Sequence, residues 1–176
     1  MNKETLREKL VVVLKVLTEN DGMLFRSPVE EDTGYDARKL HEVCINHKLA
    51  EHLADIVIPN VETGEKLFAD IEFNREGINF KAVEIEGKKL VVRPDVIIHN
   101  RKSGQSKFNF LVVECKKAGA YEWEIKQDRD KIVALMKGAK YQYQFGLQLI
   151  YGENSVVGHL FFCNGTEIKA EVVSYP

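Results

Sequence analysis

The fold is decided by the stretch LVVRPDVIIHNRKSGQSKFNFLVVECK, residues 90–116. Its two ends, residues 90–98 and 108–114, are rich in the β-branched and aromatic residues that favour strands. Between them, residues 100–106 are polar with a central glycine, which is typical of a turn. The stretch therefore predicts two strands joined as a hairpin.

The hairpin brings two carboxylates together. If Asp95 faces Glu114, the residue numbers of every facing pair add to 209, and the chain must turn between Gly104 and Gln105, where the sequence independently places its turn. Facing residues lie about 4.5–5.5 Å apart at Cβ, so these two carboxylates can share one divalent cation. Because side chains alternate along a strand, Lys116 lies on the same face as Glu114, and Cys115 lies on the other.

This arrangement suits phosphodiester chemistry. Mg²⁺ commonly binds one or two carboxylates and completes its shell with water and substrate phosphate. Such an ion stabilises developing negative charge and activates water. A neighbouring lysine can orient that water, accept its proton or stabilise the phosphate. A metal would lower the pKa of Lys116 and the two acids would raise it, and both outcomes stay open.

The remaining elements complete an α/β prediction: a mixed β-sheet flanked by helices in the order α-α-β-β-β-α-β-β. The first helix has its apolar stripe at Leu6, Leu10, Val13, Leu14 and Leu17. The second is capped by Asp36 and faces inward through Leu40, Val43, Cys44, His47, Leu49, Ala50 and Leu53. A loop separates them at 26–34. The expected helices are 3–19, 36–55 and 123–137, and the other strands are 67–73 (with 80–83 as its hairpin arm), 143–150 and 156–162. The predicted domains are an N-terminal helix, residues 1–22, for packing or dimer contact, and a core at 36–176.

The composition argues against several classes of protein. The net charge is −2 and the pI is about 6.2, which argues against a protein that binds nucleic acid through bulk positive charge. Three widely spaced cysteines predict reduced, mostly buried thiols rather than disulfides or a zinc site. No apolar run approaches a membrane span, and the N-terminus lacks a signal-peptide pattern, so we expect a soluble, cytoplasmic protein.

Pro94-Asp95, eighteen residues, and then Glu114-Cys115-Lys116 resembles the PD-(D/E)XK pattern of restriction-endonuclease-like nucleases. The resemblance covers residues 36–151, and the strings 45–51 and 69–75 look like a group of small bacterial members. It implies a restriction-endonuclease-like core, with Asp95 and Glu114 as metal ligands and Lys116 as the catalytic lysine. It further implies an acidic catalytic and metal-binding residue on the first core helix. Glu51 is that candidate, with Glu42 on the same helix as the alternative.

Several other side chains are candidates for nucleic-acid binding, each with a plain structural alternative. His47 lies one helical turn from Glu51 and can orient it or reach a phosphate, or be a rim residue. Arg75 ends a strand and can contact the backbone, while Arg101 and Lys102 make the hairpin tip basic. Lys131 stands on a charged helix face that a solvated surface explains equally well. Tyr121 and Trp123 can stack on a base or pack the start of their helix.

The leading hypothesis is a metal-dependent nuclease, an endonuclease that hydrolyses phosphodiester bonds with Mg²⁺ or Mn²⁺, with DNA expected ahead of RNA. The alternative is a non-catalytic nucleic-acid-binding or scaffold protein that retains the fold. A homodimer or a larger complex stays open, because no large recognition domain fits within 176 residues. No membrane partner is expected.

Overall fold

The computed structural model describes residues 1–25, 37–102, 104–152 and 155–175. Its centre is a six-stranded mixed sheet in the order β1-β6-β7-β8-β9-β10. Only β7 and β8 run parallel among its neighbouring pairs. The strands are β1 (Phe68–Ile71), β6 (Val96–His99), β7 (Leu111–Lys117), β8 (Phe145–Gly152), β9 (Ser155–Asn164) and β10 (Glu167–Tyr175). The predicted α/β class with a mixed, helix-flanked sheet is confirmed.

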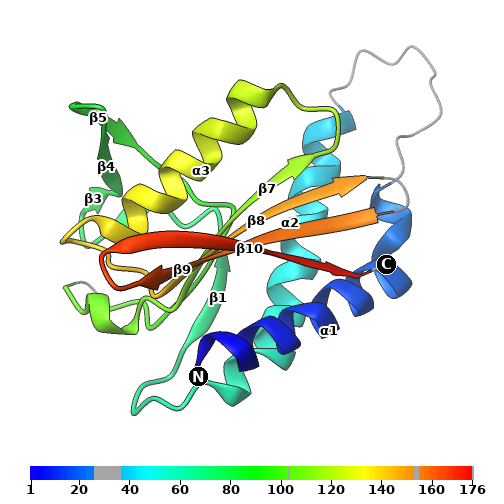
Figure 1. Cartoon of the computed structure of the whole chain (residues 1–176), viewed down its shortest axis with the longest axis horizontal. Coiled ribbons are helices and arrows are strands. Elements are labelled where there is room, and N and C mark those ends of the chain that lie inside the picture. The colour runs from blue at the N-terminus through cyan, green and yellow to red at the C-terminus, as the bar shows by residue number, and fades with distance from the viewer. Residues whose placement is uncertain (26–36, 103, 153–154, 176) are drawn as a thin grey trace.

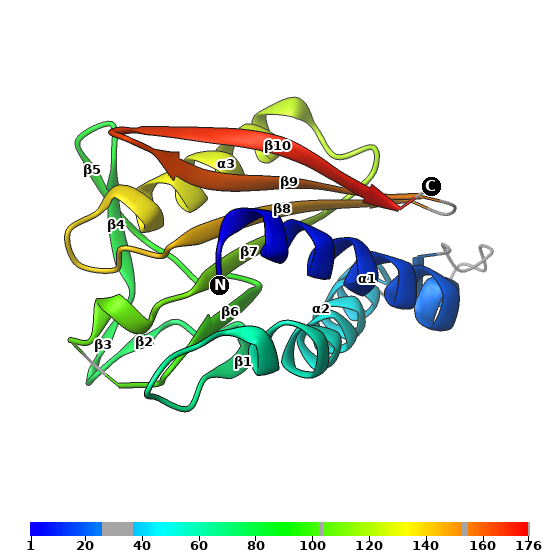
Figure 2. The same cartoon turned by 60° about the horizontal axis from the view of Figure 1, so that its bottom comes forward.

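Helices cover both faces of this sheet. α1 (Lys3–Asp21) and α2 (Ala37–Ile56) lie together on one face, and α3 (Glu122–Lys137) lies on the other (Figures 1 and 2). Two hydrophobic clusters follow from this layering, one between the sheet and α1–α2 and a smaller one between the sheet and α3. None of the helices in the described part of the chain is long and apolar enough to cross a membrane.

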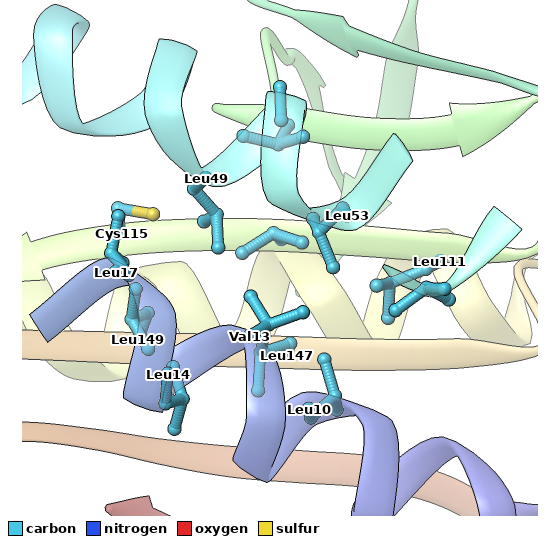
Figure 3. Close-up of a cluster of buried hydrophobic side chains, with 14 of the residues drawn as sticks. Leu10, Val13, Leu14, Leu17, Leu49, Leu53, Leu111, Cys115, Leu147 and Leu149 are labelled. Carbon is cyan, nitrogen blue, oxygen red and sulfur yellow. The ribbon is translucent and has the colours of Figure 1, made fainter. Parts of the chain in front are cut away.

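α1 follows its sequence pattern closely. Asn2 caps it by accepting a hydrogen bond from the Thr5 backbone N–H at 2.9 Å, and Gly22 ends it. The predicted stripe, from Leu6 to Leu17, is fully buried against α2, β9 and β10 (Figure 3). Of the two roles considered for this stripe, packing on the domain itself is therefore the one observed.

The inward face of α2 differs from the prediction. Val43, Cys44 and His47 are exposed, whereas Ile45 and Asn46 are buried beside Leu49, Ala50 and Leu53. The buried positions repeat at one and four residues, so the contact stripe lies further round the helix than the one chosen from the sequence. The expected loop at 26–34, the Asp36 cap and the Leu40 side chain lie outside the described residues. Cys163 is also exposed, so the prediction of mostly buried thiols is wrong: only Cys115 is buried.

The predicted strand at 90–98 is two strands in different sheets. β5 (Lys88–Val91) pairs with β4 (Ala82–Ile85), whereas β6 joins the main sheet. Pro94 lies at the break, where its missing N–H prevents a continuous ladder. The predicted pairing of 67–73 with 80–83 is also wrong, because β1 pairs with β6. A second short hairpin joins β2 (Arg75–Glu76) and β3 (Asn79–Phe80).

The sequence reading missed β10, which pairs with β9 along its whole length. Its signal was available: Gly165, with φ of 65°, opens a two-residue loop that suits a tight hairpin. The strand is mostly exposed, and its Ile168, Ala170 and Val172 alternate with Glu167, Lys169 and Glu171, a period of two that also indicates a strand. The predicted helix at 123–137 is confirmed, with Gly138 at its C-terminus.

Candidate active site

The predicted register of the hairpin is confirmed. Val96 faces Val113, and Ile98 faces Leu111, so each facing pair adds to 209. Asp95 immediately precedes β6, and its Oδ2 accepts a hydrogen bond from the Cys115 backbone N–H at 2.7 Å. The connection between the strands is longer than a tight turn and contains a short 3₁₀ helix, Ser106–Phe108. The register thus sets Asp95 beside Glu114.

Glu114 is the buried member of this pair. Only 3% of its surface is exposed, and alternation along β7 turns it toward α3 while Cys115 packs on the α1–α2 side. Its Oε1 has no hydrogen-bond partner among the described residues, and its Oε2 lies 3.8 Å from Lys131 Nζ. A buried carboxylate oxygen without a partner costs free energy. Glu114 therefore has the capacity to bind a further group.

α3 adds two charged side chains to the site. Asp128 is 2% exposed, and its carboxylate lies 2.8 Å from Lys131 Nζ and 3.2 Å from Lys116 Nζ. We call Asp95, Glu114 and Asp128, with Lys116 and Lys131, the carboxylate cluster. The solvated-surface alternative for this helix face is wrong for Asp128 and Lys131, although Lys126 on the same helix is exposed.

The protonation equilibria in the cluster reflect crowding of negative charge. Burial raises the pKa of Asp95 to about 6, and the charge of Asp128 contributes in the same direction. Burial also raises the pKa of Glu114 well above its usual value, with Asp95 as the next cause. Burial lowers the pKa of Lys116, but Asp128 more than offsets this, and the net shift is upward. The neighbouring acids therefore outweigh burial in setting the pKa of Lys116, and the lowering of that pKa by a metal stays a prediction.

The donor set fits a hard divalent cation. Two carboxylates suffice for Mg²⁺, which fills its remaining positions with water and phosphate. A cation would relieve the repulsion between Asp95 and Glu114, and Glu114 Oε1, which has no hydrogen-bond partner among the residues described, could bind it as a ligand. Within the described residues, no group of three or more His, Cys, Asp or Glu side chains is arranged to hold a metal ion. Any ion bound here would therefore rest on few protein ligands.

The two candidate acids of α2 lie in different surroundings. Glu51 is exposed and paired with Lys48 at 2.7 Å and with His47 at 3.3 Å, so the predicted contact with His47 is present. Glu42 lies on another face of α2. Its charge raises the pKa of Cys115 and Tyr151, although burial is the largest cause for both. The charge of Asp95 also raises the pKa of Cys115 and of Tyr151. The structure therefore places Glu42, rather than Glu51, near Cys115 and Tyr151, on the face of the sheet opposite to Glu114 and Lys116.

The basic candidates of the loop lie at the far end of β6. Arg101 pairs with Asp70, and Lys102 pairs with Glu65 at 2.6 Å. Four residues of strand, about 13 Å, separate this region from Asp95. Arg75 lines the same region. These three cations are thus not gathered around the carboxylate cluster.

Sequence reasoning missed one residue in the cluster's surroundings. Gln148 is fully buried beside Glu114 in the β7–β8 register. Its amide nitrogen donates to the Ile125 carbonyl, and its oxygen accepts from Arg129, both at 2.8 Å, which fixes α3 over β8. A glutamine within the apolar string FGLQLI was the available signal. Tyr121 and Trp123 are 71% and 63% exposed with their rings 6.5 Å apart, so packing does not explain them.

Comparison of the chain with family models, with curated proteins and with solved structures finds no match. The geometry of the site itself is therefore the basis for proposing a function.

Proposed function

We propose that this protein is a metal-dependent nuclease with a restriction-endonuclease-like core, and that it hydrolyses phosphodiester bonds in DNA. The observation that carries the proposal is the pairing of Asp95 with the buried Glu114, whose Oε1 has no hydrogen-bond partner within the described part of the chain, beside Lys116. Two crowded carboxylates and an ammonium group on one patch of sheet are the parts that phosphodiester hydrolysis with one bound Mg²⁺ or Mn²⁺ requires.

Each residue has a separate role in this proposal. Asp95 and Glu114 hold the cation, which supplies Lewis-acid stabilisation of the phosphate and a more acidic water. Lys116, held by Asp128, places positive charge where negative charge develops on the phosphate. Asp128 is a positioning residue, since it holds both lysines of the cluster.

Glu42 is the acid of α2 that we assign to the site in place of Glu51. The two residues offer a matched pair for testing. Glu42→Gln is expected to lower the cleavage rate, because its charge reaches the region of Cys115 and Asp95. Glu51→Gln is expected to leave the rate unchanged, because its contacts are Lys48 and His47.

The test is cleavage by purified protein of linear, circular and single-stranded DNA, and of RNA, with Mg²⁺ or Mn²⁺. Lys116→Ala should abolish cutting, and Lys131→Ala should reduce it. Lys126→Ala is the matched control, because Lys126 stands on the same helix as Lys131 but is exposed and pairs with Asp130. Cutting that persists in both Lys116→Ala and Asp95→Ala would contradict the site assignment.

One observation favours the second candidate, a nucleic-acid-binding or scaffold protein without turnover. The described residues offer no ready three-ligand metal group, and Lys131 already lies near Glu114. Under this alternative, calorimetry finds DNA binding without Mg²⁺ binding, and no substrate is cut. Mg²⁺ binding that Asp95→Asn removes would exclude it.

A further inference from the structure

Two aromatic side chains lie together on the surface at the start of α3. Tyr121 and Trp123 are both mostly exposed, and their rings are nearly parallel, with 14° between the planes and 6.5 Å between the centres. Of the three exposed aromatic side chains in the described part of the chain, only these two stack on one another. A buried aromatic ring is a large source of stability in a folded protein. Two neighbouring rings left in water therefore point to a ligand rather than to the core.

The backbone holds this pair in a fixed place. Tyr121 is the N-cap of α3: its N–H donates to the Glu124 carboxylate at 3.1 Å, and its carbonyl accepts from the Glu124 N–H at 3.0 Å. Trp123 stands in the first turn of the helix that follows. Because the backbone that carries both rings is already ordered, a ligand that stacks on them loses little affinity to ordering of the protein.

The pair lies next to the carboxylate cluster. Only residues 118–120 separate Tyr121 from the end of β7, the strand that carries Glu114 and Lys116. Tyr121 also precedes Asp128 by two helical turns, about 10 Å at 1.5 Å per residue, and Asp128 contacts Lys116 at 3.2 Å. Residues two turns apart share one side of a helix. A nucleic-acid strand with a phosphate at Lys116 therefore has its neighbouring bases within reach of the two rings.

The surroundings of the rings select the kind of group that binds. Glu122 and Glu124 are their neighbours in the sequence, and this negative charge disfavours a phosphate on the rings themselves. The flat ring faces remain as the feature that a ligand can recognise. Bases of single-stranded nucleic acid offer matching faces and stack on aromatic side chains whatever their sequence. In a continuous duplex, a base must first be unstacked, which weakens its binding.

We propose that Tyr121 and Trp123 form a stacking platform for an unpaired base, and that the nucleic acid bound at the carboxylate cluster is single-stranded there. This inference rests on the proposed nuclease function and deepens it, because it names the form of the substrate. The base stacks on the rings while the adjoining phosphate faces Lys116. A free strand, a gap or a single-stranded tail therefore binds where a continuous duplex does not.

The test is binding of fluorescently labelled DNA to the whole chain in EDTA, measured by anisotropy. Wild-type protein should bind a short single-stranded oligonucleotide about tenfold more tightly than a blunt duplex of the same sequence. A strand of equal length with abasic sites in place of its bases keeps the phosphates and should also bind about tenfold more weakly.

Variants of the two rings assign this preference to the platform. Trp123→Ala should weaken binding of the single strand roughly fivefold, and the double variant Tyr121→Ala/Trp123→Ala should weaken it about tenfold or more. Trp123→Phe keeps a flat ring and should restore most of the affinity. Phe80→Ala removes the third exposed aromatic side chain, on the β2–β3 hairpin, and is the matched control that should leave the affinity unchanged.

The platform is overturned if wild-type protein binds the single strand no more tightly than the duplex or the abasic strand, or if the double variant matches Phe80→Ala. It is also overturned if the double variant alters the mass of the protein by light scattering and not its DNA binding, because the rings then join two copies. EDTA prevents metal-dependent cleavage, so these results do not depend on cutting. The proposed function fails separately, if Mg²⁺ supports no cleavage or if cleavage survives Lys116→Ala.

Discussion

The two ends of β6 shift the pKa of a carboxylate in opposite directions. Burial raises the pKa of Asp95 to about 6, and Asp128 adds to the shift. Burial also raises the pKa of Asp70, but hydrogen bonds from Arg101 and His99 more than offset this, and that pKa lies well below its usual range. Asp70 contacts its cations directly, whereas Asp95 shares two lysines with two other carboxylates.

This difference separates the two ends by their net charge. At the Asp95 end, negative charge exceeds the positive charge beside it, and a cation would stabilise the folded state. At the Asp70 end, Arg101 and His99 already pair with the carboxylate, so it needs no further cation.

The largest expected effect comes from removing the charge of Asp95. Asp95→Asn should lower the Mg²⁺-dependent cleavage rate about a thousandfold, because several kcal/mol of transition-state stabilisation depend on the cation it holds. The same variant should be at least as resistant to urea as the wild type at pH 7, because a repelling buried charge is gone. Cleavage kinetics and urea denaturation on one preparation measure both. Loss of activity with loss of stability would mean that Asp95 is structural.

The second prediction concerns pH and uses metal-free protein in EDTA. A folded-state pKa of about 6 for Asp95 lies above its unfolded value. The folded state therefore takes up the proton first, and the free energy of unfolding should rise as the pH falls, by about 1.3 kcal/mol between pH 7 and 5 and by about 3 kcal/mol in all once the pH is below the unfolded pKa. The raised pKa of Glu114 also makes the free energy of unfolding rise as the pH falls.

The matched variants make this pH test specific. Asp95→Asn should flatten the rise between pH 7 and 5. The contribution of Asp70 has the opposite sign: with a lowered pKa, it stabilises the fold above its unfolded pKa and is lost only in more acidic solution. A free energy of unfolding that falls steadily from pH 7 to 5 would contradict the charge imbalance proposed for the cluster.

The residues of the cluster divide into those that local patterns predict and those that depend on packing. Asp95, Glu114 and Lys116 follow from two apolar strands, a polar connection and alternation, because register and facing are set locally. Asp128 does not follow from its neighbours: it stands among Lys126 and Asp130, and only the placement of α3 over β7 and β8 buries it.

The same distinction explains the corrections to the fold. The limits of α1 and α3 follow from helical periodicity and their flanking residues. The buried face of α2 depends on the angle at which it meets α1 and the sheet, which a stripe of apolar residues specifies only loosely. Likewise, Pro94 predicts a break in pairing but not that β5 leaves the main sheet for β4. Which partners a segment meets is a property of the whole chain.

A third prediction probes the opposite end of β6. Asp70→Asn removes the charged partner of Arg101 and buried His99, and it should reduce the free energy of unfolding at pH 7 by about 2 kcal/mol. Cleavage by this variant should persist at temperatures where it stays folded, because Asp70 lies outside the carboxylate cluster. Urea denaturation of the Asp70→Asn and Asp95→Asn variants, side by side, measures the difference in their free energies of unfolding. Equal shifts of the same sign in the two variants would show that the ends do not differ.

The smallest expected effect locates single-stranded DNA relative to the two ends. Trp123, the only tryptophan in the chain, is exposed at the start of α3, the helix that carries Asp128 and Lys131, and Phe80 is equally exposed on the β2–β3 hairpin. If a base stacks at the cluster end, an oligonucleotide should quench tryptophan fluorescence, and Trp123→Ala should weaken binding by about 1 kcal/mol, roughly fivefold. Phe80→Ala should then have no effect. The reverse result would place the bases on the β2–β3 hairpin instead of at the carboxylate cluster.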